Sequence, residues 1–229
     1  MTGSTSGAVT LSGQIHACLR GSILGGEYAP GDALPSERKL SEELETNRHA
    51  VREALKRLQQ AGLVSISQGG ATRVRDWRRH GGLELLLELG SQGEAPEALH
   101  APRAAMEMRA CIGADAARRC AQRADAALKA QIAARAEQLA QVEDLEARNA
   151  HYEVLWDLIV DGADNIAYRL ALTTLVERQR LASINAAAVA GELGDVRAIR
   201  ALTRAIGDGR ADDARTQATE LLERSIPGG

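Results

Sequence analysis

The segment TNRHAVREALKRLQQAGLV, residues 46–64, carries two different stripes of side chains on one predicted helix. At 3.6 residues per turn, residues three and four apart lie on the same face. The apolar stripe is formed by Val51, Leu55 and Leu58. The basic stripe beside it is formed by Arg48, Arg52 and Lys56. Such a helix is predicted to pack by its apolar edge and to present positive charge from the neighbouring edge.

Two further helices are predicted before this one. The segment LSGQIHACLRGSILGG, residues 11–26, places apolar residues at four-residue spacing and ends at a pair of glycines. Ser36 follows a proline and is a good N-cap for ERKLSEEL, and Thr46 or Asn47 caps the next helix. Only two or three residues then separate the second and third helices, which predicts a helix-turn-helix.

A short β-hairpin is predicted after the third helix. The segment LVSISQGGATRVR, residues 63–75, alternates apolar and polar residues on both sides of QGGA. Three helices followed by a hairpin form a winged helix-turn-helix.

The rest of the chain has an almost wholly helical pattern, beginning with LELLLELG after Gly82 and with a long helix from Pro102. Further helices are expected over residues 126–142, 144–161, 165–189, 195–207 and 210–225, separated by DGADN, GELGD and GDGRAD. The predicted fold is therefore mainly α, with an all-α antiparallel bundle after the winged helix. The predicted divisions are a flexible tail (1–10), the winged helix-turn-helix (11–78), a linker (79–90) and the helical domain (91–229).

Composition restricts the class of protein. The 229 residues are 45% apolar and 26% charged, as in globular proteins. MTGSTSGAV has no apolar leader and no run of about 18 apolar residues occurs, so we expect a cytoplasmic protein without membrane contact. Cys18, Cys111 and Cys120 form no CxxC pair, which argues against a disulfide framework and a thiolate zinc site. All three are expected to be small buried apolar residues.

Charge is distributed unevenly along the chain. Residues 1–80 carry 11 basic and 8 acidic side chains, whereas the remainder carries 17 basic and 23 acidic ones. Residues 48–79 hold eight basic side chains against Glu53 and Asp76. This asymmetry suggests an N-terminal part that faces DNA and an acidic C-terminal part.

The segment LPSERKLSEELETNRHAVREALKRLQQAGLVSISQGGATRV resembles the DNA-binding domain of GntR-superfamily bacterial regulators. The family pattern is roughly P-S-E-R-x-L, then S-R-x-x-V-R-E-A-L, then L-x-x-x-G-L-V and a glycine-containing wing. Three positions depart from it: Glu45 where the turn often has Gly, Asn47 where Ser is usual, and Ala71 where a second wing glycine is common. These departures affect the expected operator preference and not the expected fold.

The resemblance implies which residues contact DNA. The third helix would enter the major groove, where arginine can bridge the two guanine acceptors, and the wing tip would reach the minor groove. The predicted contacts are Arg38, Asn47, Arg48, His49, Arg52, Gln68 and Gly69. The alternative for the basic stripe is a solvated helix face, and His49 alternatively only covers the turn.

The C-terminal part resembles the helical effector domain called FCD, found in the FadR branch of this superfamily. PRAAMEMRACIGADAARRCA fits its first long helix, with Arg103 and Glu107 at the family's R-x-x-x-E spacing. NAHYEVLWDLIVDGADN fits a later helix, with His151 at the usual histidine. The predicted effector-binding residues are Arg103, His151, Tyr152 and Trp156. The alternative for Arg103 and Glu107 is an ordinary ion pair within one helix.

No metal or other cofactor is expected. Many FCD domains hold a divalent metal through one carboxylate and three histidines, but no histidine follows His151 here, and Ala147 stands where the carboxylate usually lies. His151 is then a hydrogen-bonded core residue. An enzyme is not expected either, since G-x-S-x-G and G-x-x-x-x-G-K-[ST] are absent, and the single E-x-x-H, from Glu97 to His100, lies in a proline-flanked stretch.

The sequence thus predicts a homodimeric regulator, a repressor of metabolic genes, that binds pseudo-palindromic double-stranded operator DNA. Its expected effector is a fatty acyl-CoA or a related amphipathic acid, because a site without the metal must use apolar volume and fixed charge. Effector binding would change the relative placement of the two DNA-binding domains through residues 75–90. Two alternatives remain open: an FCD-type regulator that responds to a small organic acid, and a constitutive DNA-binding protein whose bundle only dimerises.

Overall fold

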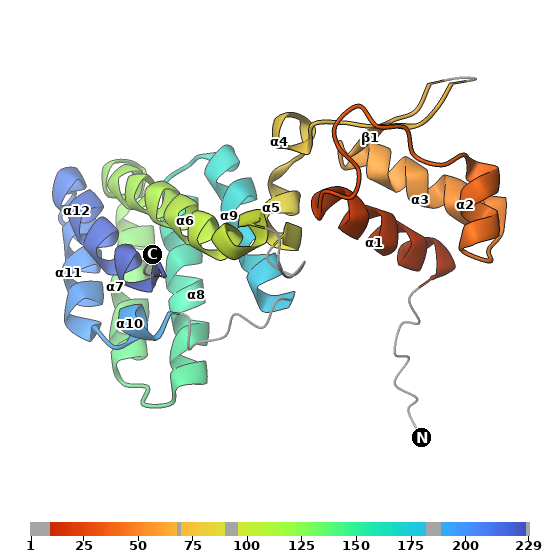
Figure 1. The fold of residues 1–229 in the computed structure, drawn as a ribbon. Helices are drawn as coiled ribbons and strands as arrows, with labels where there is room; N and C mark the ends of the chain where they lie inside the picture. The colour runs from red at the N-terminus through yellow and green to blue at the C-terminus, as the bar shows by residue number, and fades with distance from the viewer. Residues whose placement is uncertain (1–9, 68–69, 90–95, 182–188, 228–229) are drawn as a thin grey trace. The chain divides into compact units, whose positions relative to one another are not determined.

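The computed structural model describes residues 10–67, 70–89, 96–181 and 189–227. The chain divides into two compact units, residues 1–99 and 100–229. Figure 1 labels the helices and strands of both units.

The first unit is built on helices α1 (Leu11–Leu24), α2 (Glu37–Glu43) and α3 (Arg48–Gln60). Helix α1 packs against α3, and α2 also contacts α3. The apolar stripes predicted from spacing are buried on both long helices, since Ile15, Leu19 and Ile23 of α1 are at most 4% exposed. Val51, Leu55 and Leu58 of α3 are at most 1% exposed. Burial of these side chains fixes which face of α3 remains in solvent.

The turn between α2 and α3 is short because each helix is capped locally. Ser36 accepts a hydrogen bond from the Lys39 amide and begins α2, and Asn47 accepts one from the Ala50 amide at 2.8 Å and begins α3. Glu45 has φ +46°, a left-handed conformation that favours glycine, at the position where the family often has Gly. The turn between α2 and α3 thus has the left-handed conformation with Glu45 in place of the glycine that is common in the family.

The wing is a two-stranded antiparallel hairpin. Strand β1 (Val64–Ser65) pairs with β2 (Arg73–Val74), with Val64 opposite Val74 and Ser65 opposite Arg73. Ala33 forms an isolated bridge with Arg73, so the segment before α2 is tied to the wing. Together with the three helices this confirms the predicted winged helix-turn-helix.

Helix α3 leads into the wing through Gly62, a glycine that no other residue can replace without strain. Its φ is +75°, and an added Cβ would lie 2.1 Å from the carbonyl oxygen of His80. His80 is the last residue of helix α4 (Trp77–His80), which is followed by α5 (Leu83–Leu89). The close approach holds the end of α3 against the end of α4.

The second unit is all α, as predicted. Its helices are the long α6 (Pro96–Arg123), which begins just inside the first unit, α7 (Ala126–Ala140), α8 (Leu145–Gly162), α9 (Ile166–Leu181), α10 (Ala190–Leu193), α11 (Val196–Gly207) and α12 (Ala211–Leu222), with a 3₁₀ turn at Glu223–Ser225. Helix α7 packs against both α8 and α11, and α11 packs against α12.

Two local expectations for this unit were wrong. Helix α6 begins at Pro96 and contains Pro102, whereas the sequence predicted its start at Pro102. Pro96 takes the first helical position, where a missing N–H costs nothing, and Pro102 removes one donor from the helix interior. The predicted break GELGD, residues 191–195, overlaps the short helix α10. The helix predicted over 165–189 is seen to Leu181, and its next seven residues lie outside the described part.

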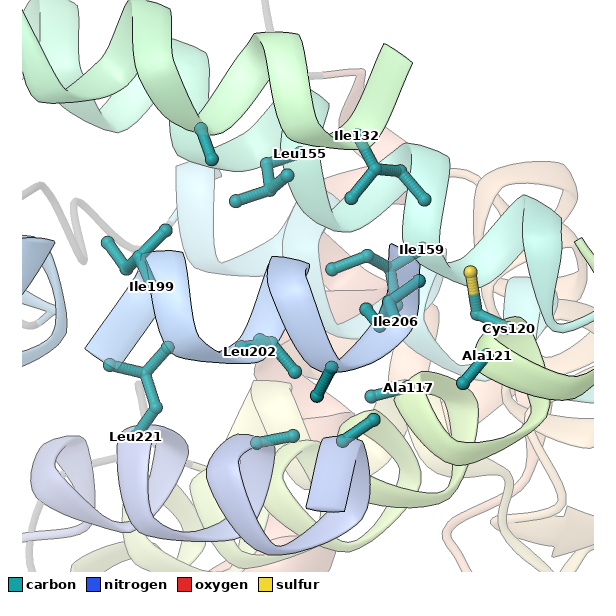
Figure 2. Packing of buried hydrophobic residues seen from close by; sticks show 14 of the residues in the cluster. Ala117, Cys120, Ala121, Ile132, Leu155, Ile159, Ile199, Leu202, Ile206 and Leu221 are labelled. Carbon is teal, nitrogen blue, oxygen red and sulfur yellow. The ribbon is translucent and has the colours of Figure 1, made fainter. Parts of the chain in front are cut away.

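The core of this unit is made mainly of aliphatic and small side chains, which come from α6, α7, α8, α10, α11 and α12 (Figure 2). Leu155, Ile159, Ile199, Leu202 and Ile206 are fully buried. Small residues let the helices approach closely: an added Cβ on Gly162 would lie 2.5 Å from the Cys120 sulfur. The core is thus filled without a single phenylalanine in the sequence.

The three cysteines are free thiols in different surroundings. Cys120 is buried, and desolvation raises the pKa of its thiol to about 11. Cys18 and Cys111 are exposed, contrary to the expectation that all three are buried. Within the described residues, no helix combines the length and apolarity needed to cross a membrane.

Candidate functional site

The exposed face of α3 presents the basic stripe predicted from the sequence. Arg48, His49, Arg52 and Lys56 are all exposed. They remain in solvent because the opposite face of the same helix is buried in the core of the first unit. Arg48 forms no hydrogen bond or ion pair with any residue that the structure describes, so its guanidinium is available to an anionic partner.

Arg52 is held by a carboxylate from the preceding helix. Its Nη2 lies 2.8 Å from Oε2 of Glu37, and its Nε donates to both carboxylate oxygens at 3.2 and 3.3 Å. The hydrogen bond from Arg52 lowers the pKa of Glu37, with added attraction from Arg52 and Arg48. The structure therefore pairs Arg52 with Glu37 across the helix-turn-helix, a contact that helical spacing alone did not predict.

The other predicted DNA-contacting residues have varied surroundings. Arg38 pairs with Glu42 at 2.9 Å on the surface of α2. Asn47 uses its side-chain oxygen for the N-cap of α3. His49 is exposed, and its side chain has no hydrogen bond with any residue that the structure describes. Gln68 and Gly69, predicted at the wing tip, lie outside the described residues.

Arg103 and Glu107, predicted near an effector in the second unit, form an ion pair on the surface of α6. The Nε of Arg103 lies 2.8 Å from Oε1 of Glu107, and the two side chains are 44% and 51% exposed. An exposed pair at this spacing contributes only a few tenths of a kcal/mol to stability. The geometry is that of the ordinary intrahelical pair, and direct effector contact by Arg103 stays a prediction.

His151 is hydrogen-bonded to a basic side chain. Nη1 of Arg135 on α7 lies 3.1 Å from its Nδ1. Because a guanidinium only donates, Nδ1 of His151 is the acceptor in this contact. Among the described residues, no group of three or more His, Cys, Asp or Glu side chains is arranged to hold a metal ion.

Tyr152 and Trp156 lie one turn apart on α8, with ring centroids 6.2 Å apart at 88°. Edge-to-face contact of this kind is favourable between aromatic rings. Tyr152 is 2% exposed, and its hydroxyl donates to Oε2 of Glu192 at 2.6 Å. Tyr152 is thus part of the protein interior, and the half-buried Trp156 packs against the same core.

Two charged residues that meet Tyr152 could not be predicted from the sequence. Arg109 of α6 donates through Nη1 and Nη2 to the two oxygens of Glu192 at 2.7 and 2.8 Å. Glu192 belongs to α10 and is fully buried. Arg109 and Glu192 are 83 positions apart, so no local pattern links them. A glutamate within a predicted break was the only available signal.

Comparison with known proteins finds a family match within the first unit. The sequence model of the family described as "Bacterial regulatory proteins, gntR family" matches residues 11–74. These bounds run from the first residue of α1 to the last residue of β2. The matched segment is therefore the winged helix-turn-helix itself.

Individual relatives cover different shares of the chain. HTH-type transcriptional regulator Mce2R of Mycobacterium tuberculosis is 42% identical over 149 residues, which is 65% of this chain and 61% of that protein. The fatty acid metabolism regulator protein of Vibrio cholerae is 40% identical over 65 residues, 28% of this chain and 23% of the relative. The solved structure of Streptococcus agalactiae GntR is 20% identical with a TM-score of 0.45, over 93% of this chain and 97% of that one. The chain thus spans less than two thirds of the first relative.

Proposed function

We propose that the protein is a cytoplasmic, homodimeric transcription regulator of the GntR type that represses metabolic genes. In support, residues 11–74 match the sequence model of that family of bacterial regulatory proteins. The observation that carries the proposal is α3, whose apolar face is buried and whose basic face is exposed within the matched domain. In a helix-turn-helix this helix occupies the major groove. Two copies in a dimer would read the half-sites of a pseudo-palindromic operator.

The residues of this surface have distinct proposed roles. Arg48, which forms no ion pair with the described residues, would bridge the guanine O6 and N7 acceptors. Arg52, oriented by Glu37, would contact a base or a nearby phosphate, and Arg38 would hold the phosphate backbone from α2. Asn47 and His49 lie at the N-terminal end of α3, where such helices meet base edges. Gln68 and Gly69 would reach the minor groove.

Substitution of Arg48 tests the DNA-binding role. An operator is first selected from random double-stranded DNA with the full-length protein. Loss of one bidentate base contact in Arg48→Ala is expected to cost about 1 to 3 kcal/mol of operator binding, with helicity and Tm unchanged. Arg215→Ala, which removes an exposed arginine of α12, is the control and should bind like the parent. Equal operator affinity of Arg48→Ala and the parent at matched salt would show that the recognition helix is assigned wrongly.

The second unit is proposed to bind an acyl-CoA or a related acid that releases the operator. In support, it contains the buried guanidinium of Arg109 beside Tyr152, whose ring packs edge-to-face on Trp156. The Vibrio relative, which matches over 28% of this chain, is named a regulator of fatty acid metabolism. Binding would act on the DNA-binding domains through residues 75–90. An arginine that meets a carboxylate and an aromatic pair with a polar edge are suited to an amphipathic acid.

Titration of the operator complex with acyl-CoAs of increasing chain length tests the effector. Release that strengthens with chain length is expected, since each buried methylene contributes about 0.8 kcal/mol of transfer free energy. Release by lactate or citrate without release by any acyl-CoA would replace this effector by a small organic acid. An operator complex insensitive to both classes would favour the constitutive DNA-binding protein.

A further inference from the structure

A carboxylate is enclosed inside the second unit, where side chains of α6, α8 and α10 meet. Both oxygens of Glu192 accept from the guanidinium of Arg109, at 2.7 and 2.8 Å, and Oε2 also accepts from the Tyr152 hydroxyl at 2.6 Å. Glu192 is 0% exposed, and the side chain of Arg109 is 12% exposed. A planar guanidinium fork with one added hydroxyl donor is a geometry that recognises carboxylates in general, whatever molecule carries them.

The two donors are fixed on long helices. Arg109 lies on the 28-residue helix α6, and Tyr152 lies on the 18-residue helix α8, where its ring belongs to the main core. Burial and the neighbouring Glu192 raise the pKa of Tyr152 well above its usual value of 10, so its hydroxyl remains a donor at physiological pH. Arg109 stays charged, because Glu192 more than offsets the effect of burial on its pKa. The donor half of the cluster is therefore preorganised.

The acceptor comes from a much smaller element. Helix α10 has four residues, and its N-cap, Val189, provides no side-chain hydrogen bond. Besides Glu192, α10 is held by the buried Leu193, whose carbonyl accepts from Arg148 at 3.3 Å, and by packing against α8 and the 3₁₀ turn. The acceptor, Glu192, thus lies on the short helix α10, whereas the two donors lie on the long helices α6 and α8.

Electrostatics require an anion between these donors but do not require this particular one. A buried guanidinium without a partner is strongly unfavourable, whereas the intact pair contributes little net stability, because desolvation offsets the attraction. Replacing one carboxylate by another conserves the charge and the hydrogen bonds. Glu192 differs from a free acid mainly in being tethered, which gives it a high effective concentration and makes it a competitor.

We propose that Arg109 and Tyr152 form a binding site for the carboxylate of an organic acid, and that Glu192 occupies this site as an internal ligand in the free protein. The inference deepens the proposed function and rests on it, because this acid would be the effector of the second unit. An incoming acid displaces Glu192 and detaches α10 from α8. The tethered carboxylate thereby sets the concentration of acid that the protein requires.

Octanoate, with the neutral octanamide as its analogue, is the probe for this site in the full-length protein. Glu192→Ala removes the internal carboxylate and leaves space for a free one. It is expected to have a lower Tm than the parent, to regain Tm in octanoate but not in octanamide, and to bind octanoate at least about tenfold more tightly by calorimetry. Adding Arg109→Gln to Glu192→Ala should abolish the gain.

Glu137→Ala is the matched control, because it breaks another Arg–Glu pair of the same unit, with Arg200, which lies on the surface. It should show no gain in octanoate binding. If Glu192→Ala fails to fold with and without octanoate, Glu192→Gln takes its place, since it keeps the side-chain volume and removes the charge. Octanoate binding no tighter in the foldable variant than in the parent would overturn the inference, and so would failure of both variants to fold in octanoate.

The outcomes separate this inference from the proposed function. Operator release by an acyl-CoA in the parent, with no gain of octanoate binding in the Glu192 variants, would refute the internal ligand and leave the regulator intact. A gain that depends on Arg109, in a protein that selects no operator, would support the carboxylate site and refute the regulator.

Discussion

Arg52, on the proposed DNA-binding surface, is paired with Glu37, and we expect this pairing to have two opposed effects on DNA binding. The carboxylate holds the guanidinium in one orientation, which reduces the conformational entropy lost on binding a base. It also places a negative charge where phosphates approach. Glu37 should therefore favour specific over non-specific binding.

Glu37→Gln tests this balance. Without the charge, affinity for unrelated DNA should rise about fivefold at low salt, while the ratio of operator to unrelated affinity falls, because Arg52 is no longer held in place. Dissociation constants for both DNAs at matched salt provide the measurement. Glu137→Gln, which removes a carboxylate from the second unit, should leave both constants unchanged. If Glu37→Gln behaves in the same way as this control, the carboxylate has no part in DNA selection.

Asp115 is a carboxylate whose ionised form stabilises the second unit. Burial raises its pKa, but hydrogen bonds from Tyr168, Arg119 and Arg118 outweigh this and lower the pKa from 3.8 to about 2. A pKa lowered by folding contributes stability that is complete above the unfolded value and is lost as the pH falls through the folded one. The contribution should thus decline between about pH 4 and pH 2.

Asp115→Asn should lower the free energy of unfolding at pH 7 by about 1 to 2 kcal/mol, allowing for solvent screening of a partly exposed group. Denaturant unfolding of parent and variant at a series of pH values measures the difference. This difference should shrink below pH 4, whereas Glu220→Gln, which alters an exposed residue of α12, should differ little from the parent throughout. A constant difference down to pH 2 would contradict the assigned pKa.

At the scale of single residues, the sequence predicted which side chains are exposed or buried better than it predicted which side chains form ion pairs. The exposure of Arg48 and Arg52 follows from helical spacing, because their apolar neighbours must be buried. The partners Glu37 and Glu192 depend on how separate helices pack, and that information is absent from local spacing. Buried charge in particular is hard to predict, since the same residue type is normally exposed.

At the scale of elements, the strongest predictions were those with local causes. The start of α3 follows from the Asn47 cap, and the hairpin follows from alternation on both sides of a glycine pair. The bounds of α6 and the existence of α10 were predicted less well. The conformation of Pro102 and of the GELGD segment depends on packing against other helices more than on local sequence preference. A proline within a long helix and a helix of four residues both need support from neighbouring elements.

Gly62 gives an element-scale prediction about the junction of α3, the wing and α4. Gly62→Ala adds a Cβ that would lie 2.1 Å from the His80 carbonyl oxygen, and it also forces a non-glycine residue to φ +75°. We expect a loss of about 3 kcal/mol or more in the free energy of unfolding of the first unit.

Gly26→Ala is the control for Gly62→Ala. Gly26 has φ +83° but no atom within 4 Å of its added Cβ, so this variant should lose only about 1 kcal/mol. Thermal unfolding monitored by circular dichroism gives both values. Equal losses would mean that the contact with His80 relaxes without cost.

At the scale of the whole molecule, periodicity and charge were the informative features. Helical spacing predicted a mainly α chain with one small hairpin, and the structure confirms this fold class. The predicted divisions at residues 78 and 90 depend on no strong local signal, and they stay predictions. The chain also lacks the histidines of the metal site that many FCD domains contain.

Chelation provides a prediction for the complete protein. Extensive dialysis against EDTA should change neither the Tm nor the operator response, because His151 has Arg135 as its partner and the described residues group no ligands around it. Elemental analysis before and after dialysis is the companion measurement. Stoichiometric zinc, nickel or manganese that is lost together with stability would contradict this expectation.

Because Cys120 is buried, its rate of chemical modification can report the opening of the core of the second unit. An alkylating reagent attacks the thiolate, and this thiol is both covered by the core and held protonated by its raised pKa. Cys18 and Cys111 should therefore be modified promptly in the native protein, whereas Cys120 should react only when the helices around it separate. The slow phase of labelling then measures how often this core opens, without any engineered probe.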